Sequence, residues 1–396
     1  MAELAETRTI DLLDRDFYSG DPDPTYAWMR ANAPVYWDEK NQLWGVSRYD
    51  DVVEVSRNAD IYSSAQGARP NTPPDSSMIN QDDPQHNLQR RLVNKGMTPQ
   101  MVAKLESDMR AVVSEIIDRV AGRGECEFVK EVAVPLPMRM IAELLGVPPE
   151  DEDRLQHWSD TMIGGADGPQ YITEEVNNAF LEFVEYQQAI IAERLAEPRD
   201  DFISKIVHAE IDGKSFELGE QIAESLLLLV GGNETTRNVI SGSMLALMRH
   251  PDQRQALIDD PSKLPLAIEE FVRWVTPILN FRRTVTRDTV LGGQQLRQGD
   301  NVLIMYSSAN RDEAIFDEPH KFDITRDPNP HIAFGQGRHF CLGANLARLE
   351  IRVIFEELLR RLPDIRLADG AEIAYSNSAF IRGVKSMPVV FTPEQA

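Results

Sequence analysis

The segment FGQGRHFCLG, from Phe334 to Gly343, constrains this chain more than any other. Its inner glycines permit backbone conformations with positive φ and a close approach to a flat partner. Cys341 directly precedes a helical repeat, and the free N–H groups and dipole of a helix start stabilise a thiolate. A lone thiolate on such a loop suits axial ligation of haem iron. From these residues alone, a buried structural cysteine and a catalytic pair with His339 stay open as alternatives.

Composition excludes several classes of protein. The chain has 396 residues, of which 42% are hydrophobic and 27% charged, as in ordinary globular proteins. Its longest strongly aliphatic run, 226–230, is far short of the roughly 20 residues that span a bilayer, and we expect a cytoplasmic protein without a membrane anchor. A net charge of −23 opposes binding to nucleic acid or anionic membranes. Two cysteines supply neither a disulfide framework nor a zinc knuckle.

The hydrophobic pattern predicts a mainly α fold with small β-sheets. Strand-like segments lie at 33–37, 42–47 and 282–306, and helical patterns fill about 85–275 and 342–362. No linker or repeat divides the chain. We therefore expect one domain over 1–396, with a discontinuous β region drawn from 33–60, 282–306 and the C-terminus.

An unusually long helix is expected over 219–249. Its middle holds two adjacent glycines, Gly231 and Gly232, and each costs about 1 kcal/mol relative to alanine inside a helix. Such a cost makes sense where a large group must approach the backbone. Glu234 and Thr235 follow, and on an exposed helix they would form an ordinary polar patch.

The cysteine segment resembles the haem-binding loop of the cytochrome P-450 superfamily, F-G-x-G-x-H-x-C-x-G, at every fixed position. Three further motifs of that family follow in the expected order, so the resemblance covers essentially the whole chain. It implies the cytochrome P-450 fold, with the long helix lying over a buried haem b, iron protoporphyrin IX. Cys341 would be the axial iron ligand, and Phe334, Gly335 and Gly343 would shape the loop around the haem.

The resemblance also assigns roles on the distal side of the haem. Thr235 would hydrogen-bond the bound dioxygen and Glu234 would relay protons from solvent. An acid–alcohol pair of this kind favours an enzyme that receives electrons from a partner over one that runs on peroxide.

Two further motifs concern the proximal side and the haem propionates. Glu270 and Arg273, at i and i+3, match the E-x-x-R helix, and with Arg326 they would hold the proximal loop in shape. Burying unpaired carboxylates is costly, so the propionates need cationic donors. By resemblance these donors are His86, Arg90, Arg283 and His339, although each residue alone could be an ordinary surface side chain.

The substrate is less constrained. Residues expected to line the distal pocket are mostly aliphatic, and ordinary core packing is the alternative for each. They are Met78, Ile79, Met162, Ile163, Leu227, Val230, Ile278, Leu279 and Phe380. Segments 28–32, 231–237 and 386–391 resemble the actinobacterial steroid side-chain hydroxylases, whereas Arg311 and the Arg282–Arg283 pair follow the general bacterial pattern.

The resemblance as a whole implies a haem-thiolate monooxygenase that inserts one atom of O2 into a C–H bond of a hydrophobic molecule, such as a steroid, another isoprenoid or a lipid. Electrons would come from a ferredoxin and its reductase, and the enzyme would be a monomer. A basic proximal patch would steer the ferredoxin. It would comprise Arg90, Arg91, Lys95, Arg338, Arg348 and Arg352. A non-catalytic haem-thiolate protein that binds a ligand or transfers electrons, and a peroxide-driven hydroxylase, are the alternatives.

Overall fold

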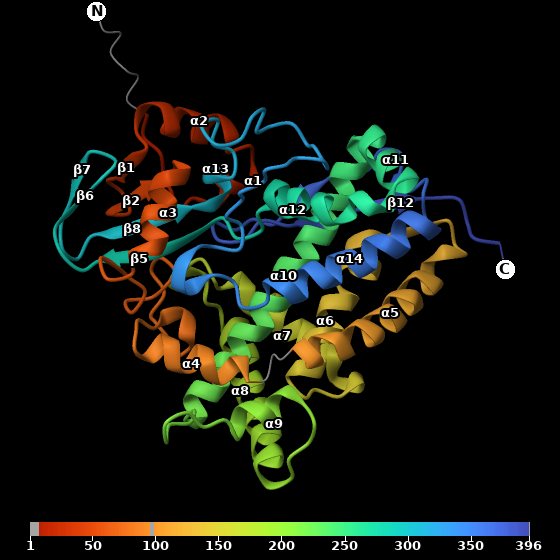
Figure 1. Cartoon of the computed structure of the whole chain (residues 1–396), viewed down its shortest axis with the longest axis horizontal. Helices are drawn as coiled ribbons and strands as arrows, with labels where there is room; N and C mark the ends of the chain where they lie inside the picture. The colour runs from red at the N-terminus through yellow and green to blue at the C-terminus, as the bar shows by residue number, and fades with distance from the viewer. Residues whose placement is uncertain (1–7, 96–98, 396) are drawn as a thin grey trace, which may run out of the picture.

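The computed structural model describes residues 8–95 and 99–395. Figure 1 shows the largest sheet and the hairpin of β6 (Thr289–Leu291) and β7 (Gln294–Leu296) on one side of the molecule and most of the long helices on the other, with β12 (Pro388–Val390) among the helices. The helices are α1 (Arg15–Ser19), α2 (Asp23–Asn32), α3 (Tyr49–Arg57), α4 (Gln85–Asn94), α5 (Pro99–Ala121), α6 (Pro135–Leu144), α7 (Glu152–Gly164), α8 (Glu174–Ala196), α9 (Phe202–Val207), α10 (Leu218–Arg249), α11 (Pro251–Asp259), α12 (Leu264–Val275), α13 (Tyr306–Ala309) and α14 (Ala344–Arg361). This mainly helical architecture confirms the predicted fold class.

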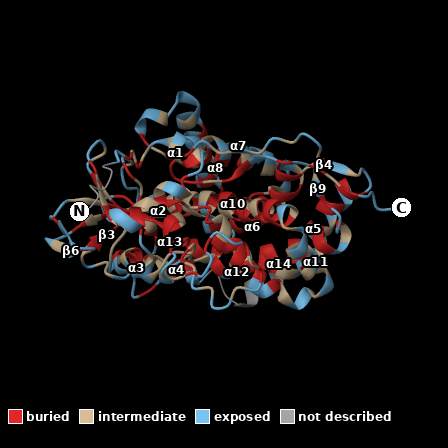
Figure 2. Cartoon of the chain, turned by 90° about the horizontal axis from the view of Figure 1, so that it is seen from above, coloured by how far each residue is buried: buried red, intermediate tan, exposed pale blue. Residues whose placement is uncertain are grey.

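Helix α10 is the axis of the helical region. It has 32 residues and begins at a capping box, in which Glu217 and Glu220 each accept a hydrogen bond from the other's backbone N–H. It ends at Arg249, two residues before Pro251, which cannot continue the helix. Helices α6, α12 and α14 pack against it, and Figure 2 shows these buried helices crossing the centre of the molecule. The helix predicted over 219–249 is therefore confirmed.

The strands are short. They are β1 (Val35–Asp38), β2 (Leu43–Val46), β3 (Tyr62–Ser63), β4 (Glu125–Glu127), β5 (Asn280–Val285), β6 (Thr289–Leu291), β7 (Gln294–Leu296), β8 (Asn301–Met305), β9 (Arg366–Leu367), β10 (Ala374–Tyr375), β11 (Val384–Ser386) and β12 (Pro388–Val390).

The largest sheet joins distant parts of the chain in the order β1-β2-β8-β5-β3. The N-terminal strands thus pair with strands from 280–305, and β2 runs parallel to β8. The C-terminal strands, which we expected in the same β region, lie elsewhere. Strand β12 pairs with β4 and β9, while β10 pairs with β11. Strand β4 has only three residues, too few to show the alternation that predicts a strand.

None of the helices in the described part of the chain combines the length and hydropathy needed to cross a bilayer.

Candidate active site

The loop around Cys341 is fixed by its backbone. Gly335 and Gly337 both have φ of +71°, and a Cβ at Gly337 would collide with the carbonyl oxygen of Ser56. Only glycine satisfies both demands. The N–H of Cys341 donates to the carbonyl oxygen of Phe334 at 2.8 Å and closes the loop. Cys341 thus lies two residues before Gly343, the N-cap of α14.

The electrostatics of the thiol differ from the expectation. Burial raises the pKa of Cys341, against the effects of the Gly343 N–H and the nearby charges of Arg90 and Arg348, which lower it. The helix start alone therefore does not stabilise a thiolate, because desolvation of the charged form outweighs the donors. Coordination to a metal ion would deprotonate such a thiol outright.

The four residues expected at the haem propionates come together from three segments. His86 and Arg90 lie on α4, Arg283 lies on β5 and His339 lies in the cysteine loop. The rings of His86 and His339 are 4.3 Å apart between centroids. Arg90 donates to the carbonyl oxygens of two loop residues at 3.2 and 2.7 Å, so it also ties α4 to the cysteine loop.

The positive charge of this group lies on its arginines. Burial lowers the pKa of His339 to about 2, with Arg283 and His86 adding to the effect, and burial and Arg90 lower the pKa of His86. Burial and the nearby cations therefore disfavour the charged form of both rings. Among the described residues, the buried His86 Nε2 has no hydrogen-bond partner, and the Arg283 guanidinium donates only to the carbonyl of Arg282, at 2.8 Å. Unfilled N–H donors beside two desolvated guanidinium groups fit the two carboxylates of a haem.

The two glycines of α10 differ in their surroundings. Gly231 is exposed although it lies midway along the central helix, and a Cβ there would meet nothing within 4 Å. A Cβ on Gly232 would instead collide with the side chain of Ile141 on α6. Gly231 therefore faces open space, and Gly232 permits close helix packing. The hydroxyl of Thr235 donates to the carbonyl oxygen of Gly231 at 2.6 Å, which leaves its lone pairs on the same side of the helix.

Glu234 is linked to the surface through partners that sequence reasoning missed. It is buried, and burial raises the pKa of its carboxyl group. One carboxylate oxygen pairs with Arg237, and the other, Oε2, has no hydrogen-bond partner. Arg237 in turn bonds Asp160 of α7 at 2.9 Å, and the Asp160 side chain is 49% exposed. The i, i+3 spacing of Glu234 and Arg237 could have predicted their ion pair from the sequence. No local pattern in the sequence predicts that Asp160 joins them.

The predicted structural ion pair is fully buried. The guanidinium of Arg273 donates two hydrogen bonds to the carboxylate of Glu270, both at 2.7 Å. Both side chains have 0% exposure. Arg326 lies 3.2 Å from the same carboxylate, so the structure places all three predicted residues together.

The predicted substrate residues fall into separate groups. Ile163, Ile278 and Phe380 share a small apolar cluster with Ala166 and Ile381. Met78, Met162 and Leu227 contact the main core. Ile79 and Val230 are partly exposed, on the turn Met78–Asn80 and on α10 respectively. The side chain of Leu279 packs instead in the core beneath the N-terminal segment, although its N–H donates to the carbonyl oxygen of Phe380 at 2.9 Å.

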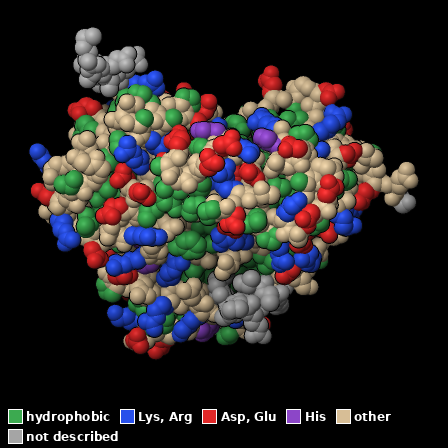
Figure 3. Space-filling model, turned by 45° about the horizontal axis from the view of Figure 1, so that its top comes forward, with side chains coloured by type: hydrophobic (Ala, Val, Ile, Leu, Met, Phe, Trp, Pro, Cys, Tyr) green, Lys and Arg blue, Asp and Glu red, His purple; other side chains and the backbone are tan. Residues whose placement is uncertain are grey.

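The basic patch expected on the proximal side is largely neutralised. Arg348 forms two hydrogen bonds with Glu269, at 2.7 and 2.8 Å, and holds the pKa of that carboxyl at about 2, together with His331. Arg338 pairs with two aspartates, and Arg352 pairs with Glu106. Figure 3 likewise shows acidic and basic side chains interspersed on the face it presents. Arg348 is therefore a poor candidate for free electrostatic steering.

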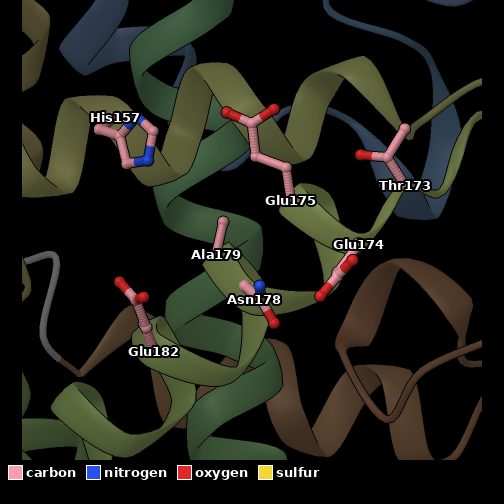
Figure 4. Close-up of a pocket in the computed structure, with 7 residues that line it drawn as sticks. All are labelled: His157, Thr173, Glu174, Glu175, Asn178, Ala179 and Glu182. Atoms are coloured by element: carbon pink, nitrogen blue, oxygen red, sulfur yellow. The ribbon is translucent and has the colours of Figure 1, made fainter.

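A surface hollow between α7 and α8 lies apart from all predicted site residues. Its lining is polar and acidic, as Figure 4 shows. The lining residues are His157, Thr173, Glu174, Glu175, Asn178, Ala179 and Glu182. Such a lining does not suit a hydrophobic substrate or a haem.

Comparison with known proteins agrees with this geometry. The family model described as Cytochrome P450 matches residues 167–363. The steroid C26-monooxygenase of Mycolicibacterium smegmatis is 43% identical over 99% of this chain and 98% of that protein. The methyl-branched lipid omega-hydroxylase of Mycobacterium tuberculosis is 39% identical over 97% of this chain and 95% of that protein.

Solved structures give the same result. A Mycobacterium marinum cytochrome P450 in complex with pseudoionone has a TM-score of 0.89 and 35% identity, covering 98% of this chain and 100% of that one. A Bacillus megaterium enzyme in complex with testosterone has a TM-score of 0.85 and 35% identity, covering 94% and 99%. With identity above 40% along its whole length, the chain belongs to the cytochrome P450 family.

Proposed function

We propose that this cytochrome P450 hydroxylates a C–H bond of a steroid or branched lipid, using the whole chain as one monooxygenase domain. The observation that carries the proposal is the meeting of the Cys341 loop with the donors of His86, Arg90 and Arg283. When bound, a haem with a thiolate ligand supplies the activation of O2.

In this proposal, the loop from Phe334 to Gly343 presents the sulfur of Cys341 to the iron. His86 Nε2, His339 and the guanidinium groups of Arg90 and Arg283 hold the propionates. Because His86 and Arg283 are buried and Arg90 and His339 are partly buried, their hydrogen bonds to a carboxylate are stronger than they would be in water. The Glu270–Arg273–Arg326 cluster keeps the proximal segments in place.

In this proposal Asp160 and Arg237 orient the carboxylate of Glu234 and link it to the surface, and the proton reaches Glu234 from solvent, because a guanidinium group does not release its own proton. Burial raises the pKa of Glu234 and so favours its protonated form, with the proton on Oε2, which has no hydrogen-bond partner among the described residues. Rotation of the carboxyl group away from Arg237 would carry this proton toward the open side of α10. There, the hydroxyl oxygen of Thr235, which donates its own proton to the carbonyl of Gly231, would accept a hydrogen bond and position the transferred proton.

The relatives support the substrate class. Enzymes named for steroid C26 oxidation and for omega-hydroxylation of methyl-branched lipids match over nearly the full chain. The apolar cluster around Phe380 suits such molecules, with Met78, Met162 and Leu227 as further lining. The shared chemistry is oxidation at the end of a branched alkyl chain.

A ferredoxin and its reductase are proposed as the electron source, acting on the monomeric, cytoplasmic enzyme. Arg91 is the remaining docking candidate, because it is 56% exposed and its one carboxylate, Asp212, lies 3.8 Å away on the surface. Arg91→Glu should slow reduction at low salt without changing substrate binding. Arg360→Glu, at the far end of α14, is the control and should leave the rate unchanged. Equal reduction rates in the parent, Arg91→Glu and Arg360→Glu would exclude Arg91 as a docking residue for the ferredoxin.

The central test is the carbonyl spectrum of the reduced protein, followed by product analysis. The parent should show the thiolate signature, and Cys341→Ser should lose it. With a surrogate ferredoxin, reductase and NADPH, cholest-4-en-3-one or a methyl-branched fatty acid should yield a terminally hydroxylated product. A thiolate spectrum without any product would favour a ligand-binding role, and turnover with peroxide alone would favour the peroxide-driven alternative.

A further inference from the structure

Arg69 lies in the segment between β3 and the turn Met78–Asn80, beside a predicted substrate residue. Its guanidinium carbon is 5.5 Å from the centroid of the Phe380 ring. Phe380 belongs to the apolar cluster that also contains Ile163 and Ile278, and it contacts the ring of Phe281 at 5.5 Å between centroids. Arg69 therefore places a positive charge at the edge of the surface proposed to bind a lipophilic molecule.

Arg69 is partly exposed, and it differs from the other arginines whose pKa burial lowers because no described protein group accepts a hydrogen bond from its guanidinium. Burial lowers the pKa of six arginines among the described residues, namely Arg69, Arg90, Arg254, Arg282, Arg283 and Arg311. The other five each donate to a backbone carbonyl oxygen. Within the described parts of the chain, the Arg69 guanidinium makes no hydrogen bond or ion pair, and its ring contact with Phe380 satisfies none of its five N–H donors.

The two nearest carboxylates are already occupied. Asp75 and Asp167 raise the pKa of Arg69 from a distance, but neither forms an ion pair with it. Asp75 accepts hydrogen bonds from Ser77 and Asn80, and Asp167 pairs with Arg15 and accepts from Ser378 and Ala379. None of the four residues proposed at the propionates contributes to the electrostatics of Arg69, so it stands apart from that group.

The backbone on either side holds Arg69 in place. Ala68 is fixed at both of its polar atoms, since its N–H donates to Asn80 Oδ1 at 2.8 Å and its carbonyl accepts from the N–H of Arg282 at 2.7 Å. Pro70 follows and restricts Arg69 to extended conformations. A cation that is pre-positioned in this way loses little entropy when it binds a ligand.

We propose that Arg69 binds the carboxylate of an anionic lipophilic substrate, whose alkyl or steroid body packs on Phe380 and its cluster. The planar guanidinium presents parallel N–H groups that match the two oxygens of a carboxylate. A dianionic phosphate fits less well, because the carboxylates of Asp75 and Asp167 act on Arg69. This inference rests on the proposed function and narrows its substrates to steroid acids and fatty acids.

The test compares acids with their neutral esters. The holoenzyme is titrated with hexadecanoic acid, 3-oxochol-4-en-24-oic acid and the methyl ester of each, following the Soret band and, independently, calorimetric heat. The parent should bind each acid about tenfold or more tightly than its ester. Arg69→Gln should abolish that preference and leave ester affinity unchanged, and Arg69→Lys should retain part of it.

Arg382→Gln is the matched control, because Arg382 lies 4.4 Å from the Tyr375 ring but donates to the carbonyl of Gly20. It should keep the preference for acids. Equal affinity of the parent for acids and esters would overturn the inference, as would an equal loss of both in Arg69→Gln. Loss of haem from Arg69→Gln would also overturn it, by placing Arg69 at the propionates. Absence of the thiolate carbonyl spectrum in the parent would instead refute the proposed function.

Discussion

Removing the carboxylate of Glu270 should destabilise the protein strongly, because its partner would remain buried with its charge. Arg273 has 0% exposure and donates two hydrogen bonds to this carboxylate. Its other acceptors are neutral carbonyl oxygens, including those of Asn310 and Pro319 at 2.9 Å. Breaking a buried pair in this way costs about 3–5 kcal/mol. Unfolding 396 residues carries about 0.8 kcal/mol/K of entropy, so Glu270→Gln should lower Tm by about 4–6 °C.

The chain offers a matched control with the same helical spacing. Glu357 and Arg360 on α14 also form an i, i+3 pair, but the arginine is 67% exposed. Glu357→Gln should cost at most about 1 kcal/mol, since water screens the pair. The free energy of unfolding is measured with guanidinium, following the Soret band and the far-ultraviolet dichroism. Replacing Glu270 and Arg273 together with leucine should cost less than the sum of the single replacements. A loss for Glu270→Gln no larger than that for Glu357→Gln would refute the reasoning.

Four further substitutions probe the central helix and its neighbour α14. Thr235→Ala should retain haem yet lower product formation at least about tenfold while peroxide accumulates, and unchanged coupling of NADPH to product would argue against its proton-positioning role. Gly231→Ala should stabilise α10 by about 1 kcal/mol but weaken the binding of hydrophobic compounds. Gly232→Ala should lower the free energy of unfolding by about 1–3 kcal/mol, because it displaces Ile141. Denaturation and Soret titration of both variants check these two expectations. Burial raises the pKa of Glu350 to about 8, so the folded state binds its proton more tightly than the unfolded chain and stability falls as pH rises from about 4.5 to about 8. Glu350→Gln should therefore match the parent at pH 4 and exceed its unfolding free energy at pH 9 by up to about 5 kcal/mol, and parallel pH profiles would contradict this.

The sequence predicted those parts of the fold that have a local signal. The helix over 219–249 follows from its apolar period and the proline after its end, and the structure begins it one residue earlier. The cysteine loop follows from glycines that no other residue could replace. The pairing of β4 with β12 could not be predicted, because it joins three-residue strands separated by about 260 positions. Contacts of this kind leave no periodic pattern in either segment.

The same division applies to the site. Motifs located Glu234, Glu270 and Cys341, and the structure supplies the partners that decide how such residues behave. Asp160 reaches Glu234 only through Arg237, and Glu269 neutralises an arginine that we expected to steer a redox partner. The sequence shows which residues carry a charge, but it does not show whether a residue from another part of the fold neutralises that charge.

The arginines of the molecule separate into two kinds. Arg273 is neutralised by a carboxylate, whereas Arg90 and Arg283 donate to carbonyl oxygens, which satisfy hydrogen bonds but leave a net charge. Arginines that donate only to carbonyl oxygens remain able to attract the carboxylates of a haem. Reconstitution of the haem-free protein can test whether Arg283 does so. The haem-free protein should bind protohaem at least about tenfold more tightly than its dimethyl ester, and Arg283→Gln should reduce that ratio. Arg254→Gln is the control, because Arg254 also donates to a backbone carbonyl but belongs to none of the predicted haem contacts, and it should leave that ratio unchanged. Equal affinity for the two haems would show that these guanidinium groups do not hold the propionates.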